Sequence, residues 1–302
     1  MQPYIPEYIR ARQTGRLKQA IQKGLDMLSA CTLCPRRCRV DRTRDDTGYC
    51  GTGRRAKVAS YSPHFGEEPP LVGDYGSGTI FFSHCNLQCV FCQNHEISIQ
   101  GEGHIVFPNQ LAAMMIRLQE QGCHNINFVT PAHVVPQILE ALDTAVDLGL
   151  RIPLVYNCSG YESLDTLALL DGIIDIYMPD FKFWDNAAAG RFCSAPDYRE
   201  TAQAAIQVMH AQVGDLTMTR EGIACAGLLV RHLVMPGRLE DTRRILAFLK
   251  TAVSAGTHIN LMSQYRPMGE AHRFSDLCRS LSAVEFRQAL EMGKASGLTL
   301  VR

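Results

Sequence analysis

Residues 79–94 read TIFFSHCNLQCVFCQN, and this stretch decides the fold. It opens with a short apolar run from Thr79 to Ser83, which predicts a buried β-strand. Cys85, Cys89 and Cys92 follow at once, with the spacing C-x3-C-x2-C. A loop directly after a parallel strand lies at the carboxyl end of the sheet, where βα folds gather their active sites. The stretch therefore predicts a chemically active loop on an α/β scaffold.

Strand-like and helix-like segments alternate from this loop to the end of the chain. Strict alternation implies a parallel sheet with right-handed crossovers, and six units suit an open doubly wound sheet or a barrel. We predict the barrel, a partial TIM-type (β/α)6 fold, with a last helix at 283–294 and a short closing strand within 296–302. The expected strands are 79–83, 125–130, 152–157, 173–178, 228–235 and 259–263, and the expected helices include 108–122, 135–149, 198–213 and 239–256.

The segment before the barrel has a different composition. The first thirty residues show apolar residues at helical spacing and predict one helix. A polar, cysteine-bearing segment follows, and residues 61–78, rich in Pro and Gly, predict a loop. We divide the chain into an N-terminal helix and metal-binding segment, 1–57, and a barrel, 58–302.

Charge and targeting features narrow the function classes. Thirty Lys plus Arg balance thirty Asp plus Glu, so we expect no nucleic-acid partner and no attraction to an anionic membrane. The start of the chain lacks an apolar signal segment and no run of about eighteen apolar residues occurs. These features predict a cytoplasmic protein.

Twelve cysteines in such a chain argue against a disulfide framework, because cytosolic thiols stay reduced. Seven fall in two clusters, and we expect the other five to be buried, inert thiols. The five scattered cysteines are Cys123, Cys158, Cys193, Cys225 and Cys278.

Three thiolates after the first strand suit a [4Fe-4S] cluster in which one iron has no protein ligand and is open to a small molecule. A structural zinc site needs four ligands. Zinc would here require His84 or His95 as the fourth, and we weigh this as the lesser alternative.

The N-terminal cluster has the spacing C-x2-C-x3-C-x11-C in a segment with little apolar surface. Four thiolates suit structural zinc or an auxiliary iron–sulfur cluster, and either metal would stabilise a segment too polar to fold alone. We favour zinc slightly. The ligands are Cys31, Cys34, Cys38 and Cys50.

The motif C-x3-C-x-aromatic-C, with Phe91 before its last cysteine, resembles that of the radical S-adenosylmethionine (SAM) superfamily. The longer string GSGTIFFSHCNLQCVFCQN, residues 76–94, is similar to the branch of pyruvate formate-lyase activating enzymes and their relatives. The resemblance covers about residues 58–270. It implies a SAM molecule on the open iron of the cluster, cleaved to a 5'-deoxyadenosyl radical that abstracts hydrogen.

The resemblance also implies SAM-binding positions at the strand ends. The Gly-Gly-Glu run of many members is replaced by NFVTPAH at residues 127–133, so Thr130 is assigned by position. The runs YNCSGYE and YMPDFK resemble D-T-N-G and M-x-D-x-K, with an Asn in place of the first Asp, so a cation site there has one charge fewer. The SAM-binding residues expected are Thr130, Asn157, Ser159, Asp180, Lys182 and Arg231.

Two further patterns concern the last strands. Arg231 and His232 are adjacent in an apolar strand, so one should face the barrel interior and the other the helices. Gln264, Tyr265 and Arg266 follow the sixth strand, and we assign them to substrate contact.

The activase reading implies two partners, an electron donor such as ferredoxin or flavodoxin and a glycyl radical enzyme. A radical SAM enzyme acting on a small molecule or peptide remains the alternative. From another class comes a non-catalytic iron–sulfur electron-transfer or binding protein.

Overall fold

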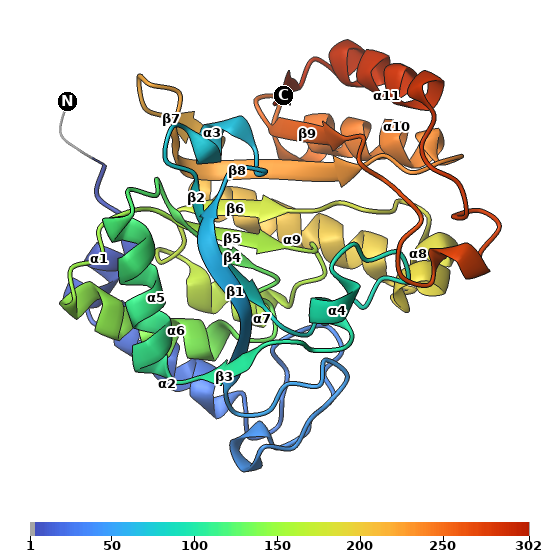
Figure 1. Ribbon diagram of the computed structural model, residues 1–302. Helices are drawn as coiled ribbons and strands as arrows, with labels where there is room; N and C mark the ends of the chain where they lie inside the picture. The colour runs from blue at the N-terminus through green and yellow to red at the C-terminus, as the bar shows by residue number, and fades with distance from the viewer. Residues whose placement is uncertain (1–3, 302) are drawn as a thin grey trace.

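The computed structural model describes residues 4–301, and its centre is a curved, mostly parallel sheet (Figure 1). Neighbouring strands follow the chain order β2-β4-β5-β6-β8-β9 without reversal, which is the winding of a barrel rather than of a doubly wound sheet. The prediction of an α/β partial barrel is confirmed. The parallel strands are β2 (Ser77–Phe82), β4 (Ile126–Val129), β5 (Leu154–Cys158), β6 (Ile176–Pro179), β8 (Ala224–Leu233) and β9 (His258–Met262).

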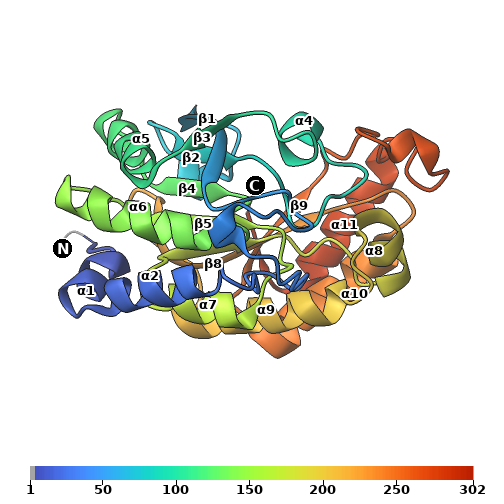
Figure 2. The same cartoon turned by 90° about the horizontal axis from the view of Figure 1, so that it is seen from below.

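Helices connect these strands and cover the outer side of the sheet (Figure 2). The four expected helices are present, and two short ones, α7 and α8, are additional. Both have eight residues or fewer, too few for a clear helical period in the sequence. The helices are α5 (Pro108–Glu120), α6 (Val135–Asp147), α7 (Leu164–Leu170), α8 (Asn186–Cys193), α9 (Tyr198–Val213) and α10 (Leu239–Phe248), the last continued by a π-helical turn, Leu249–Val253.

Side chains alternate between the helix layer and the barrel interior. Tyr177 of β6 points to the helices, where its hydroxyl donates to Gln212 of α9 at 2.6 Å. Its neighbour Met178 faces the other way and packs with Leu229 of β8. Because the period of a strand is two, Asp180 and Arg231 then face the interior as well.

Two antiparallel strands extend the sheet before the barrel. β1 (Ala56–His64) pairs with β2, and β3 (His104–Val106) pairs with the start of β1. The loop predicted from residue 61 is therefore wrong at its start. Pro63 is tolerated in β1 because β3 pairs only with 56–58, which leaves that edge free of ladder bonds at Pro63.

The connection between β1 and β2 lies on the concave face of the sheet. It contains the short helix α3 (Pro69–Val72), whose Leu71 packs with Val155, Met178 and Leu229. The side-chain amide of Asn125 donates to the Leu71 carbonyl at 2.9 Å. This segment thus covers part of the interior face of the sheet.

The N-terminal segment forms two helices rather than the single one predicted. α1 (Glu7–Gln13) and α2 (Arg16–Asp26) are separated at Gly15, whose φ of 77° only glycine adopts readily. A 3-10 turn, Arg42–Arg44, follows within the cysteine-bearing segment. β1 begins at Ala56, so the division of the chain at residue 57 falls inside a strand, and two domains remain a prediction.

The C-terminal elements agree with expectation. α11 (Ala283–Ser296) precedes β10 (Thr299–Leu300), which pairs parallel to β9. Residues 1–3 and 302, where the first helix and the closing strand were expected to extend, lie outside the described part of the chain. The remaining elements are α4 (His95–Ser98), β7 (Thr217–Met218) and a 3-10 turn, Ala271–Arg273.

Across residues 4–301, no helix combines the length and the apolar character needed to cross a lipid bilayer.

Candidate functional site

The three-cysteine motif forms the loop between β2 and α4. His84 and Gln88 take left-handed backbone conformations, with φ of 71° and 54°, which lets the loop turn tightly. The loop is fixed from outside, because the side-chain amide of Asn86 donates to the Tyr161 carbonyl at 2.7 Å. The sequence thus places all three thiols on one anchored loop at the carboxyl end of the sheet.

Each of these thiols has a polar neighbour. The Cys85 sulfur accepts from the backbone N–H of Leu87 at 3.3 Å, and the Cys92 sulfur accepts from the Ser98 hydroxyl at 3.1 Å. Burial raises the pKa of Cys85 to about 12. A positive charge beside such a thiol favours its deprotonated form, and a coordinated iron would supply that charge.

The donor set therefore fits a site-differentiated cluster by its chemistry. The positions of the sulfur atoms do not by themselves form a metal site. Among residues 4–301, no three His, Cys, Asp or Glu side chains converge as a metal-binding group. The histidines of the zinc alternative have other contacts. The His84 ring lies against Gly51 and Gly101, and the Nδ1 of His95 is 3.4 Å from the Gln100 amide nitrogen.

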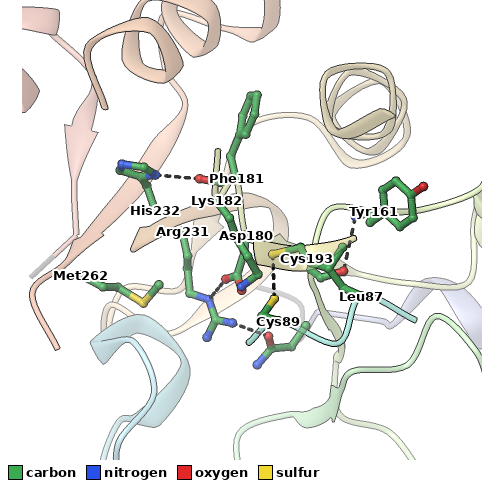
Figure 3. Close-up of polar contacts among 12 residues, drawn as sticks. Leu87, Cys89, Tyr161, Asp180, Phe181, Lys182, Cys193, Arg231, His232 and Met262 are labelled. Atoms are coloured by element: carbon green, nitrogen blue, oxygen red, sulfur yellow. Dashed lines mark hydrogen bonds and ion pairs between the residues drawn. The ribbon is translucent and has the colours of Figure 1, made fainter. Parts of the chain in front are cut away.

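A charged network lies at the ends of β5, β6 and β8, beside the cysteine loop (Figure 3). Asp180 accepts from the Arg231 Nε at 2.8 Å and from the Lys182 Nζ at 2.5 Å. Arg231 also donates to the side-chain oxygen of Asn157 at 2.6 Å. Burial alone would raise the pKa of Asp180, but the two cations outweigh it and hold that pKa below its usual value.

The lysine of this network also lies near the motif. Burial opposes the charge of Lys182, yet Asp180 and the neighbouring Cys89 raise its pKa above the usual value. Lys182 therefore stays charged and is 14% exposed at its side chain. Four of the six predicted SAM-binding residues, Asn157, Asp180, Lys182 and Arg231, thus meet in one cluster.

The other two predicted residues border this cluster. Thr130 donates its backbone N–H to the Asn157 carbonyl at 2.9 Å, with a φ of 61° that is costly for a β-branched residue. The carbonyl of Ser159 accepts from the Tyr198 hydroxyl at 2.8 Å. The same hydroxyl donates to the Asp180 carbonyl at 3.0 Å, so Tyr198 ties the ends of β5 and β6 together. Its helix position gave no sign of this role.

Two acidic residues that the sequence did not indicate complete the surroundings of Arg231. Glu67 lies 3.4 Å and Glu68 4.0 Å from its guanidinium nitrogens, and the Asn260 amide donates to Glu68 at 2.9 Å. Burial raises the pKa of Glu67 to about 7 although Arg231 opposes the rise. Both residues belong to the Pro- and Gly-rich stretch that reads as a surface loop, so only the fold brings them here.

The alternation expected at the fifth parallel strand is confirmed. Arg231 faces the interior, whereas the His232 ring donates its Nδ1–H to the Phe181 carbonyl at 2.7 Å and accepts at Nε2 from the Thr242 hydroxyl of α10 at 2.9 Å. Burial lowers the pKa of His232 to about 4, so the ring is neutral at pH 7. His232 joins the sheet to its helix layer.

Substrate contact was expected after the sixth strand, and one of the three residues is placed in the core instead. Tyr265 is 2% exposed, and its hydroxyl donates to the Leu277 carbonyl at 2.7 Å. Its ring lies 6.1 Å from that of Phe91, the aromatic residue of the motif. Tyr265 therefore supports the cysteine loop from behind. Gln264 and Arg266 keep their assignment as predictions.

Three of the four N-terminal cysteines are buried, and Cys38 is half-buried. Cys31, Cys34 and Cys50 are each less than 8% exposed. Burial, with the nearby Cys50 and Cys31, raises the pKa of Cys34 to about 12. A Cβ atom on Gly48 would lie 2.3 Å from the Cys38 sulfur, so a side chain at that position would displace this thiol. Four cysteine thiols are suitable metal ligands, and the presence and identity of a metal here stay predictions.

The scattered cysteines differ from one another. Cys123 and Cys158 are buried as expected, whereas Cys225 is half-buried and Cys278 is exposed. Cys193 is buried but not isolated, because its sulfur lies 3.2 Å from that of Cys89 in the motif. The expectation of an inert thiol therefore overlooked this contact.

Comparison with known proteins adds one clear relationship. No family model matches the chain. Over 306 aligned positions the chain is 32% identical to the uncharacterized protein MJ0674 of Methanocaldococcus jannaschii, an alignment that covers 98% of this chain and 82% of that protein.

Solved structures of low sequence identity are also similar. A domain of a pyruvate-formate lyase-activating enzyme from Bacteroides vulgatus aligns with a TM-score of 0.37 and 15% identity, over 64% of this chain and 89% of that one. Methylornithine synthase and a radical SAM methyltransferase from Sphaerobacter thermophilus each give a TM-score of 0.48 and 13% identity. These two cover 74% of this chain, which spans 63% and 65% of theirs.

Proposed function

This chain belongs to the same family as the M. jannaschii protein MJ0674, whose name assigns no activity, and we propose its function from its own site: a radical SAM enzyme. Cys85, Cys89 and Cys92 would hold a [4Fe-4S] cluster with one open iron. The observation that carries the proposal is the position of this motif, on the loop after β2, beside the charged cluster around Asp180.

When bound, a reduced cluster supplies the electron that cleaves SAM to methionine and a 5'-deoxyadenosyl radical. The protein's own residues would bind and orient the SAM molecule. Lys182 and Arg231 present two permanent cations where a carboxylate needs charge-assisted hydrogen bonds. Their burial strengthens these bonds, since water is kept from competing.

The finer proposal is an activase. The run MPDFK, Met178–Lys182, resembles M-x-D-x-K of the activating enzymes. The substrate would then be a backbone glycine of a glycyl radical enzyme, and ferredoxin or flavodoxin would deliver the electron. A small molecule or peptide substrate would use the same charged cluster.

The decisive experiment separates catalysis from electron transfer. Reconstituted, dithionite-reduced protein is incubated with SAM, and 5'-deoxyadenosine is quantified by chromatography. We expect its formation from wild type and its loss in the Cys85→Ala, Cys89→Ala, Cys92→Ala triple variant. The exposed Cys278→Ala serves as the matched control and should keep the activity. A protein that binds a cluster yet forms no 5'-deoxyadenosine would point to the non-catalytic iron–sulfur class.

The activase step has its own readout. Mixing the reduced protein, SAM and a candidate glycyl radical enzyme should produce a protein-based glycyl radical visible by electron paramagnetic resonance. Formation of 5'-deoxyadenosine without that signal, but dependent on an added peptide or small molecule, would favour the alternative substrate class.

A further inference from the structure

Cys193 is the one scattered cysteine that touches the motif within the described residues. Its sulfur donates to that of Cys89 at 3.2 Å, and Cys193 itself is completely buried (Figure 3). The two residues are 104 positions apart, so the contact is a product of the fold.

Both sides of this contact are anchored. The backbone N–H of Val90, next to Cys89, donates to the carbonyl of Phe192 at 2.9 Å. Arg36 donates to the carbonyl of Cys193 at 3.0 Å and also to that of Ser194. Ser194 ends α8 with a φ of 51°, which turns the chain sharply after Cys193. The end of α8 and the motif loop are thereby fixed to each other.

We propose that Cys193 is a positioning residue for the cluster: its S–H donates a hydrogen bond to the Cys89 ligand and sets the reduction potential. The inference rests on the proposed function. Such a bond withdraws charge from a ligating sulfur and so favours the reduced cluster, which carries one more negative charge. Cys85 and Cys92 keep different partners, Leu87 and Ser98, so the effect enters through one ligand.

The first test measures the midpoint potential of the reconstituted cluster by redox titration with electron paramagnetic resonance. Cys193→Ala removes the donor and should shift the potential to more negative values. Cys193→Ser keeps a donor of similar size and should stay close to wild type. Cys123→Ala removes an equally buried thiol away from the motif and is the matched control. An unchanged potential in Cys193→Ala overturns the proposal.

A second test needs no cluster and covers the case in which a variant fails to hold one. Metal-free full-length protein is treated with oxidised glutathione, and disulfides are mapped by peptide mass. The Cys89 and Cys193 thiols would lose two protons and two electrons and form one disulfide, while glutathione disulfide is reduced to two glutathiones. We expect the Cys89–Cys193 peptide to dominate. Pairing of Cys193 with any other cysteine, or its recovery as a free thiol in chains whose Cys89 is oxidised, contradicts the contact.

The two ideas fail in different ways. A cluster with the expected dependence of potential on Cys193 but no SAM cleavage would overturn the proposed function alone. SAM cleavage by a cluster whose potential ignores Cys193 would overturn this inference alone.

Discussion

Arg36 donates its Nε–H to the backbone carbonyl of Asn86 at 2.9 Å, which joins the two cysteine clusters of the chain. Arg36 lies between Cys34 and Cys38, and Asn86 follows Cys85. The guanidinium also stacks 4.0 Å above the ring of Tyr49, next to Cys50. The N-terminal cysteine segment therefore packs against the loop that carries Cys85, Cys89 and Cys92, and Arg36 is one of the residues that join them.

Replacing Arg36 by Ala should lower the iron content of the motif after reconstitution and the melting temperature of the protein. The change removes charged donors from the carbonyls of Asn86 and Cys193, each worth about 1.5 to 3 kcal/mol in ordinary cases. Iron and sulfide analysis together with thermal unfolding checks both effects.

The neighbouring residue provides the control. Arg37 forms an ion pair with Asp165 at 3.0 Å, and both side chains are more than half exposed. Surface pairs contribute about 0 to 1 kcal/mol, so Arg37→Ala should behave almost as wild type. Equal iron loss in the two variants would mean that iron binding depends on the positive charge of this segment and not on the specific contacts of Arg36.

The N-terminal cysteines should bind metal independently of the motif. In the Cys85, Cys89, Cys92 triple alanine variant, we expect elemental analysis to find either about one zinc per chain or a residual iron cluster. Four thiolates are enough to complete either kind of site. Adding Cys34→Ser to that variant should remove this metal and destabilise the segment. A metal-free chain that unfolds at the wild-type temperature would refute the structural role.

The sequence predicts the parts of this fold that depend on local patterns. The six parallel strands were predicted because each is a short apolar run, and Arg231 and His232 follow the period of two. The single N-terminal helix failed at Gly15, where one residue in a left-handed conformation ends a helical pattern. β1 was missed because Pro63 and its neighbours, in the second half of the strand, resemble a loop.

Contacts made only by the folded chain were beyond the sequence. Glu67 and Glu68 reach Arg231 because the β1–β2 connection crosses the concave face, and no local signal reports that path. The contact of Cys193 could not be predicted for the same reason, since its partner Cys89 lies 104 positions away on a different element. Residues recognised by motif, such as Asp180 and Lys182, were predicted as a set, but their mutual pairing was not.

Glu162 should make the stability of the protein fall as pH rises. Burial raises its pKa to about 8 even though hydrogen bonds from Tyr156 and Cys158 lower it. Between these two pKa values the folded state keeps a proton that the unfolded state has released. The stabilising contribution of Glu162 is therefore fully present below pH 4.5, the unfolded value, and is lost progressively as the pH rises to about 8. The slope is at most about 1.4 kcal/mol per pH unit.

Denaturant unfolding between pH 5 and pH 8 measures this slope. Glu162→Gln mimics the neutral carboxyl and should flatten the part of the curve that belongs to this group. Glu221→Gln, at a fully exposed position, is the control. The same slope in wild type and Glu162→Gln would show that Glu162 is ionised in the folded protein.

The Lys182 and Asp180 pair gives the last prediction. Lys182→Ala should weaken SAM binding by about 1.5 to 3 kcal/mol, or roughly one to two decades in affinity, because one charge-assisted hydrogen bond to the SAM carboxylate is lost. The cluster should survive, since its ligands are untouched. Titration of SAM into reconstituted protein measures the change, and the exposed Lys18→Ala is the control. An unchanged affinity would mean that Arg231, and not Lys182, binds the SAM carboxylate.

Asp180→Asn should act differently, mainly on stability. Its two oxygens already accept from Arg231 at 2.8 Å and from Lys182 at 2.5 Å, so the change leaves two buried cations without their shared carboxylate. Breaking a buried pair in this way costs about 3 to 5 kcal/mol, which thermal unfolding would detect. Because the two cations neutralise Asp180 and Asn157 supplies no charge, we also expect SAM affinity to be independent of added potassium. A potassium-dependent affinity in wild type that disappears in Asp180→Asn would instead establish a cation at this carboxylate and would mean that Lys182 turns away from it when SAM binds.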